Sequence, residues 1–399
     1  MSLATLRWTT LATMLMFGLT GCGYFQQASN DDDMDLTEIE DSDKPEKGDF
    51  ASNVLSQEFS SEPAEGELEL KLKIGDRFPL RKTVEHRLTQ TDKSGTTVST
   101  SRTEMLLTLV VEDVLADGRK QMAVRYHRVR HEQDVGGRRV AYSSERATDP
   151  VPPEAMLYAG LANNGFSFWV GANNKVSDIV GFNDFLKRCL RNIPAQHATS
   201  VQQQLETTRS EEGIANFIDD SIGLLPYSTD PSHPAVAVKE GSYWDLEPRR
   251  SDAPIPMLVT TRCMLKELSA TTAEIMLTGN ITGPKNPVTM RSADGDMKVL
   301  VKGGQCNGSC RVDRKTGLPT QSQVQRYFEL AMEMPNGQRV QQNKETMSTI
   351  TSYLDQSQQA DASASQRVQP ASFQNAVGTE SHRKVIPAVG SRTHVNAER

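Results

Sequence analysis

The sequence predicts a mainly β protein of the α+β kind: a curved antiparallel meander, built as a half-barrel or as paired sheets, with a helical insert around residues 182–225. Three observations support this fold class. Apolar and polar residues alternate with period two on both sides of the centre. Turn residues separate these stretches at short intervals, and helical spacing is confined to the centre. Such alternation is typical of an antiparallel sheet with one solvated face.

The first half contains three alternating stretches. "LELKLKI" at 68–74 has its apolar side chains on one face: Leu68, Leu70, Leu72 and Ile74. After "GD", the stretch "RFPLRKTVEHRLTQT" continues the alternation. "EMLLTLVVEDVL" and "RKQMAVRYHRVRHE" then flank the turn "ADG", which is a β-hairpin signature.

The centre and the second half complete the meander. "NDFLKRCLRNI", "SVQQQLETT" and "SEEGIANFIDDSIGLL" have helical spacing, and Pro226 follows the last of them. Alternating strands fill residues 241–354, with expected turns at "SATT", "GPKN", "GGQCNG", "KTGLP" and "PNG". A meander of this length must close on itself or cover its concave face, for which the helices are available.

The N-terminal segment predicts export. Arg7 precedes a short apolar run that is well below the roughly 20 residues of a transmembrane helix. The run ends in Leu19-Thr20-Gly21-Cys22, which resembles the lipobox of bacterial lipoproteins. The resemblance implies cleavage before Cys22, a diacylglycerol on its sulfur and an acyl chain on its amine. Because Gly23 rather than Asp follows the cysteine, the same resemblance implies the outer membrane as the location.

The chain divides into four predicted parts. Residues 1–21 are the signal peptide, and residues 22–66 are an acidic, disordered tether. Residues 67–355 form the folded β-rich domain, with possible halves at 67–180 and 236–355 joined by the helices. Residues 356–399 are a Gln/Ser/Ala-rich disordered tail. The net charge is −7 and lies mostly in the tether, so no basic face indicates nucleic-acid binding.

Three motifs carry a family resemblance. "KIGDRFPLRKTVEHRLTQ", "VKEGSYWDLEP" and "GSCRVDRKTGLPTQSQVQRYFEL" resemble a family of uncharacterised bacterial lipoproteins across most of residues 67–354. The motifs are structural turns and imply no activity. At the level of topology alone, the chain also resembles the half-barrel carriers that move lipoproteins across the periplasm.

Four cysteines remain once Cys22 is assigned to the lipid. Because "QCNGSC" reads as a tight turn, we expect a local Cys306–Cys310 disulfide in an oxidising compartment, with Cys189 and Cys263 paired or buried. A four-cysteine zinc site is the alternative, but the spacing fits no common pattern. We expect neither a metal nor another cofactor.

Two histidines and two aromatic groups are weaker candidates. His127 and His131 are four residues apart on a strand, so we expect them to share a basic, solvated face. Four further aromatic side chains are candidates for lining an apolar cavity, with burial in the core as the simpler alternative: Phe168, Trp169, Tyr243 and Trp244.

No nucleophile, phosphate-loop or metalloprotease motif appears in the sequence. We therefore expect a non-enzymatic, lipid-anchored envelope protein that binds an apolar ligand or an envelope protein. The alternatives are an envelope enzyme of unrecognised type and a structural envelope component. A pocket in which polar residues with shifted pKa values converge would favour the enzyme.

Overall fold

The computed structural model describes residues 65–146, 151–171, 176–191, 193–194, 236–246, 248–251, 255–292 and 295–353. The chain divides into two units, Met1–Tyr353 and Leu354–Arg399, and all described residues belong to the first. The predicted signal peptide, Cys22, the tether up to residue 64 and the predicted tail lie outside the described residues. Glu65 and Gly66, which we assigned to the tether, instead belong to the first strand.

The described elements follow one another in this order: β1 (Glu65–Leu68), β2 (Arg77–Asp92), β3 (Gly95–Val114), β4 (Lys120–Val135), β5 (Arg138–Ser143), η1 (Pro153–Ala155), α2 (Met156–Leu161), β6 (Asn164–Val170), β7 (Val176–Val180), α3 (Phe182–Leu190), β8 (Val236–Lys239), β9 (Tyr243–Asp245), β10 (Arg249–Ser251), β11 (Met257–Leu268), β12 (Thr272–Thr282), β13 (Val288–Ser292), β14 (Gly295–Asp313), β15 (Pro319–Glu333) and β16 (Arg339–Ser352).

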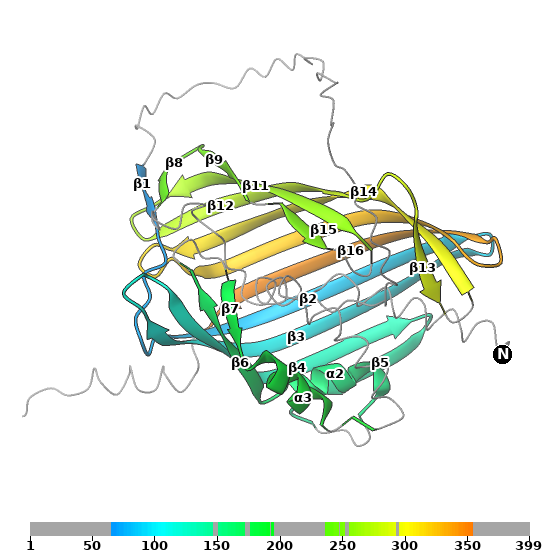
Figure 1. Cartoon of the computed structure of the whole chain (residues 1–399), viewed down its shortest axis with the longest axis horizontal. Helices are drawn as coiled ribbons and strands as arrows, with labels where there is room; N and C mark the ends of the chain where they lie inside the picture. Colours follow the sequence, from blue (N-terminus) through cyan, green and yellow to red (C-terminus); the bar gives the residue numbers. More distant parts are fainter. Residues whose placement is uncertain are drawn as a thin grey trace, which may run out of the picture. The chain divides into compact units, whose positions relative to one another are not determined.

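The mainly β fold class is confirmed. The described strands form one 14-stranded sheet with the path β10-β11-β12-β14-β15-β16-β2-β3-β4-β6-β7, and β1 pairs separately with β8. The path has two ends, β10 and β7, so the main sheet is open and is not a closed barrel. Its centre joins distant parts of the chain, because β16 pairs antiparallel with β2. Figure 1 shows these two strands side by side in orange and blue.

The long strands bury one face, as their period-two pattern predicts. In β2, every second residue from Leu80 to Gln90 is buried, and in β16 the same holds from Val340 to Thr346. Between 68 and 74 the pattern is only partly confirmed. The strand ends at Leu68, and Ile74 is 62% exposed, although Leu70 and Leu72 are buried.

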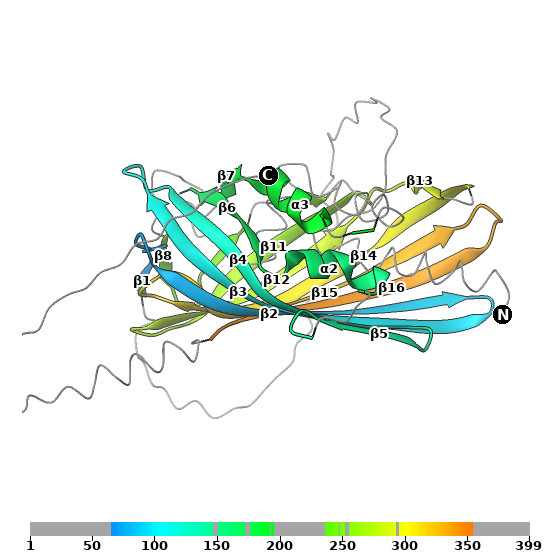
Figure 2. The ribbon, with the colours of Figure 1, turned by 90° about the horizontal axis from the view of Figure 1, so that it is seen from below.

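The helical insert is confirmed over α3. Its buried residues recur at helical spacing, which places one apolar stripe against the sheet: Phe182, Phe185, Leu186 and Cys189. The Phe166 ring of β6 lies 5.0 Å from the ring of Phe185, centroid to centroid. The other predicted helices, within 195–235, lie outside the described residues. Sequence reasoning missed η1 and α2, which are only 3 and 6 residues long. Figure 2 shows α2 and α3 on the same side of the sheet.

One expected turn does not exist. "GGQCNG" lies inside β14, which runs without interruption for 19 residues. The register shifts between Val301 and Gly303, and Gly303 has a φ of +134°. A β-bulge at Gly303, inside a continuous strand, therefore stands where we expected a turn.

The other expected turns join strands. "ADG" connects β3 to β4, "KTGLP" connects β14 to β15, and "PNG" connects β15 to β16. In the second of these, Asp313 Oδ2 accepts a 2.7 Å hydrogen bond from Thr316 Oγ1, and Gly317 has a φ of +75°. The backbone N–H of Lys71 donates to the Thr316 carbonyl at 2.8 Å, so this turn also holds the segment after β1.

The core consists of three apolar clusters. The first surrounds α2, α3 and β6, and includes Leu80, Leu107, Val129, Phe168 and Ile350. The second includes Leu88, Val299, Phe328, Leu330 and Val340. The third includes Leu68, Cys263, Leu265, Ile275 and Cys310.

Candidate functional site

The buried face of the central strands is polar in its middle. Eleven polar or charged residues on four neighbouring strands are each less than 9% exposed, and we call them the buried polar belt: Lys82, His86 and Gln90 of β2, Ser99, Ser101 and Thr103 of β3, His131 and Gln133 of β4, and Gln342, Lys344 and Thr346 of β16. A buried face of this kind is ordinarily apolar, and buried polar groups are the informative exceptions.

Strand register makes the belt continuous. Thr346 of β16 is opposite His86, which is opposite Ser101 of β3, which is opposite Gln133 of β4. One step along the strands, Thr103 is opposite His131. The belt is thus assembled across four strands.

Two histidines in the belt are hydrogen-bonded to threonine hydroxyls. His86 Nδ1 lies 3.1 Å from Thr346 Oγ1, and His131 Nδ1 lies 2.9 Å from Thr103 Oγ1. The His131 ring also stacks on Tyr158 of α2, with centroids 4.2 Å apart. These contacts fix both imidazole rings on the buried face.

Other polar atoms of the belt have no hydrogen-bond partner. They are Gln342 Nε2, Gln342 Oε1 and Gln90 Nε2. Gln342 is fully buried, at 0% exposure, and neither end of its amide is paired. An unpaired buried polar group costs roughly 1–3 kcal/mol and calls for an explanation such as a bound water or ligand.

Burial shifts the proton equilibria of the belt. It lowers the pKa of His131 to about 4 and that of Lys344 to about 7, because the interior disfavours the charged forms. The pKa of His86 also lies well below its ordinary value, through burial and then the nearby charges of Lys344, His131 and Lys82. The belt is therefore a site where basic groups converge.

Apolar clusters adjoin the belt at both ends. On β2, Leu80 of the first cluster precedes Lys82, and Leu88 of the second cluster lies between His86 and Gln90 of the belt. On β16, Val340 of the second cluster precedes Gln342, and Ile350 of the first cluster follows Thr346. The belt is a polar zone within an otherwise apolar face.

The opposite face of the same strands carries a charged groove of about 550 Å³. Its charged lining residues include both signs: Glu85, Arg87, Arg102, Glu132, Asp134 and Arg139. Arg102 Nη1 lies 2.9 Å from Glu85 Oε1, and Arg139 Nε lies 3.0 Å from Asp134 Oδ2. Such solvent-exposed cross-strand pairs contribute little energy. The belt, which holds buried and unpaired polar groups, is therefore the stronger candidate site.

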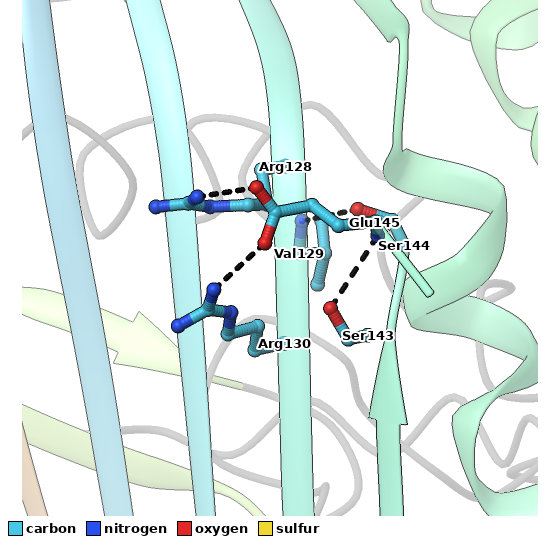
Figure 3. A network of polar contacts seen from close by, with 6 residues as sticks. All are labelled: Arg128, Val129, Arg130, Ser143, Ser144 and Glu145. Atoms are coloured by element: carbon cyan, nitrogen blue, oxygen red, sulfur yellow. Dashed lines mark hydrogen bonds and ion pairs between the residues drawn. The ribbon is translucent and has the colours of Figure 1, made fainter. Parts of the chain in front are cut away.

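A further ion-pair network lies next to this groove (Figure 3). Glu145 bridges two arginines of β4, with its oxygens 2.5 Å from Arg128 Nη1 and 2.7 Å from Arg130 Nη2. The backbone N–H of Val129 donates to Ser144 Oγ at 3.0 Å. The network fixes the segment after β5 against β4, which is a structural role.

The prediction that His127 and His131 share a basic, solvated face of β4 is wrong. The register of β3 with β4 shifts between Leu106 and Leu107, so His127 is an extra, bulged residue. Before the bulge the even-numbered residues of β4 are buried, and after it the odd-numbered residues are buried. His127 is exposed, whereas His131 is 0% exposed and belongs to the belt.

The predicted local disulfide is also wrong, because all four described cysteines are free and buried. Cys306 and Cys310 lie four residues apart on the extended strand β14, about 13 Å at the usual rise per residue. A disulfide requires Cα atoms within roughly 7 Å. Burial raises the pKa of Cys263 and of Cys310 to about 12, so these are unreactive core thiols.

The four aromatic candidates do not gather at one site. Phe168 is fully buried in the first apolar cluster, and Trp169 beside it lies under the Arg119 guanidinium, 5.8 Å from the ring centroid. Tyr243 is 65% exposed, whereas Trp244 packs against the third cluster. Phe168 and Trp169 are on β6, near one end of the sheet path, and the other two are on β9, near the other end.

Sequence reasoning missed the belt, although one signal was present. His86, Lys82, Lys344 and Gln342 occupy the apolar-phase positions of β2 and β16. Polar residues in that phase break the alternation and could have marked the site.

No group of three or more His, Cys, Asp or Glu able to hold a metal ion occurs among the described residues. None of the described helices is long and apolar enough to cross a membrane.

The fold and the belt define an open-sheet β protein with a polar zone on its buried face. The model of a family of unknown function (DUF6263) matches residues 117–319, just over half of the chain. The chain belongs to this family. We found no match among curated proteins.

Several solved structures are similar at low level. A structure of lipid–protein interactions in lipovitellin aligns with 77% of this chain and 27% of its own, at 10% identity and a TM-score of 0.39. This chain thus spans about a quarter of the length of lipovitellin. Pseudomonas aeruginosa OccK2 (OpdF), in complex with glucuronate, aligns with 71% of this chain and 100% of its own, at 9% identity and a TM-score of 0.17. At these TM-scores, neither likeness supports an argument about function.

Proposed function

We propose that this chain is a lipid-anchored protein of the bacterial cell envelope whose β domain binds a ligand, without catalysis, at the buried polar belt. The observation that supports binding is Gln342, whose amide is fully buried with both ends unpaired. A folded core gains nothing from such a group unless a bound molecule supplies its partners.

The neighbouring atoms support the same conclusion. Gln90 is opposite Gln342 in register, and its Nε2 is unpaired as well. A structural network would satisfy these groups internally, since a partly satisfied network destabilises a core. Ordered water is the alternative occupant.

The test is native mass spectrometry of the full chain carrying Cys22→Ser, purified from cells without added ligand. We expect a small molecule to remain bound, and Gln342→Leu to weaken its retention. Gln341→Leu, at the adjacent exposed position of β16, is the matched control and should retain the molecule. Masses of protein alone in every variant would contradict the binding role.

The anchor is supported by the sequence alone. Acyl chains on Cys22 would hold the protein at a membrane, because two or more chains make release negligible. Changing Cys22 to Ser should move the protein to the soluble fraction or leave its signal peptide uncleaved. Normal processing together with continued membrane association would contradict the anchor. Fractionation of inner and outer membranes tests the proposed outer-membrane location.

An enzyme is the second candidate, because basic groups with shifted pKa values converge in the belt. Each histidine also bonds a threonine hydroxyl, as a general base bonds a nucleophile. Against this, none of the described charged groups that act on His86 is a carboxylate able to orient its imidazole. Labelling of Thr103 or Thr346 by a fluorophosphonate, lost in His131→Gln or His86→Gln, would favour the enzyme.

A further inference from the structure

We propose that the ligand of the buried polar belt is an amphiphile with an acidic headgroup, a carboxylate or a phosphate, bound by Lys344, His86 and Gln342. This inference rests on the proposed function and names its ligand class.

The belt is basic in composition, which favours an anion as its ligand. Its ionisable residues are two lysines and two histidines, and no aspartate or glutamate is among its eleven members. The charges that act on His86 come from Lys344, His131 and Lys82, all of them bases. An acidic group bound among them would favour the charged form of Lys344, whose pKa burial lowers to about 7.

Two of the unpaired atoms are donors and require an acceptor, whereas Gln342 Oε1 requires a donor. The Nε2 atoms of Gln342 and Gln90 can only donate, and the two residues face each other across β16 and β2. Carboxylate and phosphate oxygens only accept, and hydrogen bonds to them are stronger than those between neutral groups. On the same face of β16, Lys344 follows Gln342 and precedes Thr346. It therefore lies between the Gln342–Gln90 pair and the Thr346–His86 pair.

The surroundings of Lys344 require the rest of the ligand to be apolar. In register, Lys344 lies between Leu88 of β2 and Phe328 of β15, and both belong to the second apolar cluster. Gln342 is opposite Leu330 of the same cluster on β15. A ligand that extends beyond its headgroup in this direction therefore meets hydrocarbon side chains, which favours an alkyl chain.

Calorimetry with three probes of equal chain length tests this inference. Tetradecanoate, tetradecyl phosphate and tetradecanol share one alkyl chain and differ in the headgroup. They are titrated below their micelle concentrations into the full chain carrying Cys22→Ser, which keeps every described residue and removes the competing lipid. We expect at least one acidic probe to bind roughly tenfold tighter than the alcohol, as a charged hydrogen bond implies. The two acidic probes compared with each other distinguish a carboxylate ligand from a phosphate ligand.

Variants test which residues cause the preference for an acidic probe over the alcohol. Lys344→Met should remove most of the preference for an acid over the alcohol, and His86→Gln, a second variant, should reduce it. Lys302→Met, at an exposed lysine of β14, should retain the preference. A preference that survives both belt variants would overturn the inference.

Failure of this inference can be separated from failure of the proposed function. Equal binding of all three probes, lost in Gln342→Leu, would refute the acidic headgroup and leave the binding role standing. The same holds if no probe binds but native mass spectrometry finds a different molecule that Gln342→Leu releases. No probe bound and no molecule retained would refute both, leaving water as the occupant of the belt.

Discussion

Thr103 Oγ1 lies 2.9 Å from His131 Nδ1, and this contact exists because of a bulge four residues earlier in β4. Without the bulge, strict alternation of β4 through His127 would place His131 on the solvated face. The bulge therefore moves a titratable side chain into the interior, beside Tyr158 of α2.

Acid should destabilise the domain through His131. Its folded-state pKa of about 4 is below the ordinary 6.5, so the unfolded chain binds more protons and stability falls as the pH falls from about 6.5 to 4. The shift corresponds to about 3 kcal/mol. Urea unfolding at pH 7 and pH 5 should show a smaller loss for His131→Phe, which retains an aromatic ring against Tyr158. His127→Phe, on the exposed face, should lose as much stability as the wild type. An equal loss in all three proteins would contradict this account.

Replacing Gln342 by Leu should stabilise the fold while weakening ligand retention. The change removes two unpaired buried polar atoms and places an apolar side chain opposite Leu330. We expect a gain of about 1–3 kcal/mol in the free energy of unfolding, measured with urea. Gln341→Leu, on the exposed face, should change it by less than about 0.5 kcal/mol. A loss of stability in Gln342→Leu would show that the amide has partners in the folded protein.

The described cysteines should stay reduced and unreactive in the folded protein. Burial raises the pKa of Cys263 and Cys310 to about 12, and all four described cysteines are buried and free. With Cys22→Ser, a thiol reagent at pH 8 should modify none of them in native buffer and all four in guanidinium. Non-reducing peptide mapping that recovers a Cys306–Cys310 bridge would contradict the structure.

Gly317 should be the least replaceable glycine of the turns. Its φ is +75°, and a Cβ there would collide with the backbone carbonyl of Glu69. We expect Gly317→Ala to cost more than about 2 kcal/mol, because it adds a backbone clash to the strain of a left-handed conformation. Gly75 is the matched control, since its φ is +88° and a Cβ would meet nothing within 4 Å. Gly75→Ala should cost only about 1 kcal/mol, and equal costs by urea unfolding would contradict the clash.

The sequence by itself determined the β class, the exposed and buried phases of the long strands, and the turns at "ADG", "KTGLP" and "PNG". These follow from local rules, because alternation and turn chemistry act over a few residues. The predicted anchor at Cys22 likewise depends on the sequence alone. Local rules failed where one residue changed the phase, as at His127, or where glycines marked a bulge within β14 and were read as a turn.

Only the tertiary structure decided the candidate site. His86 and Thr346 are 260 residues apart and meet because β16 pairs with β2. No local pattern reports which strands become neighbours, since that choice depends on the packing of the whole sheet. The belt exists through that pairing, and so does its position between two apolar clusters.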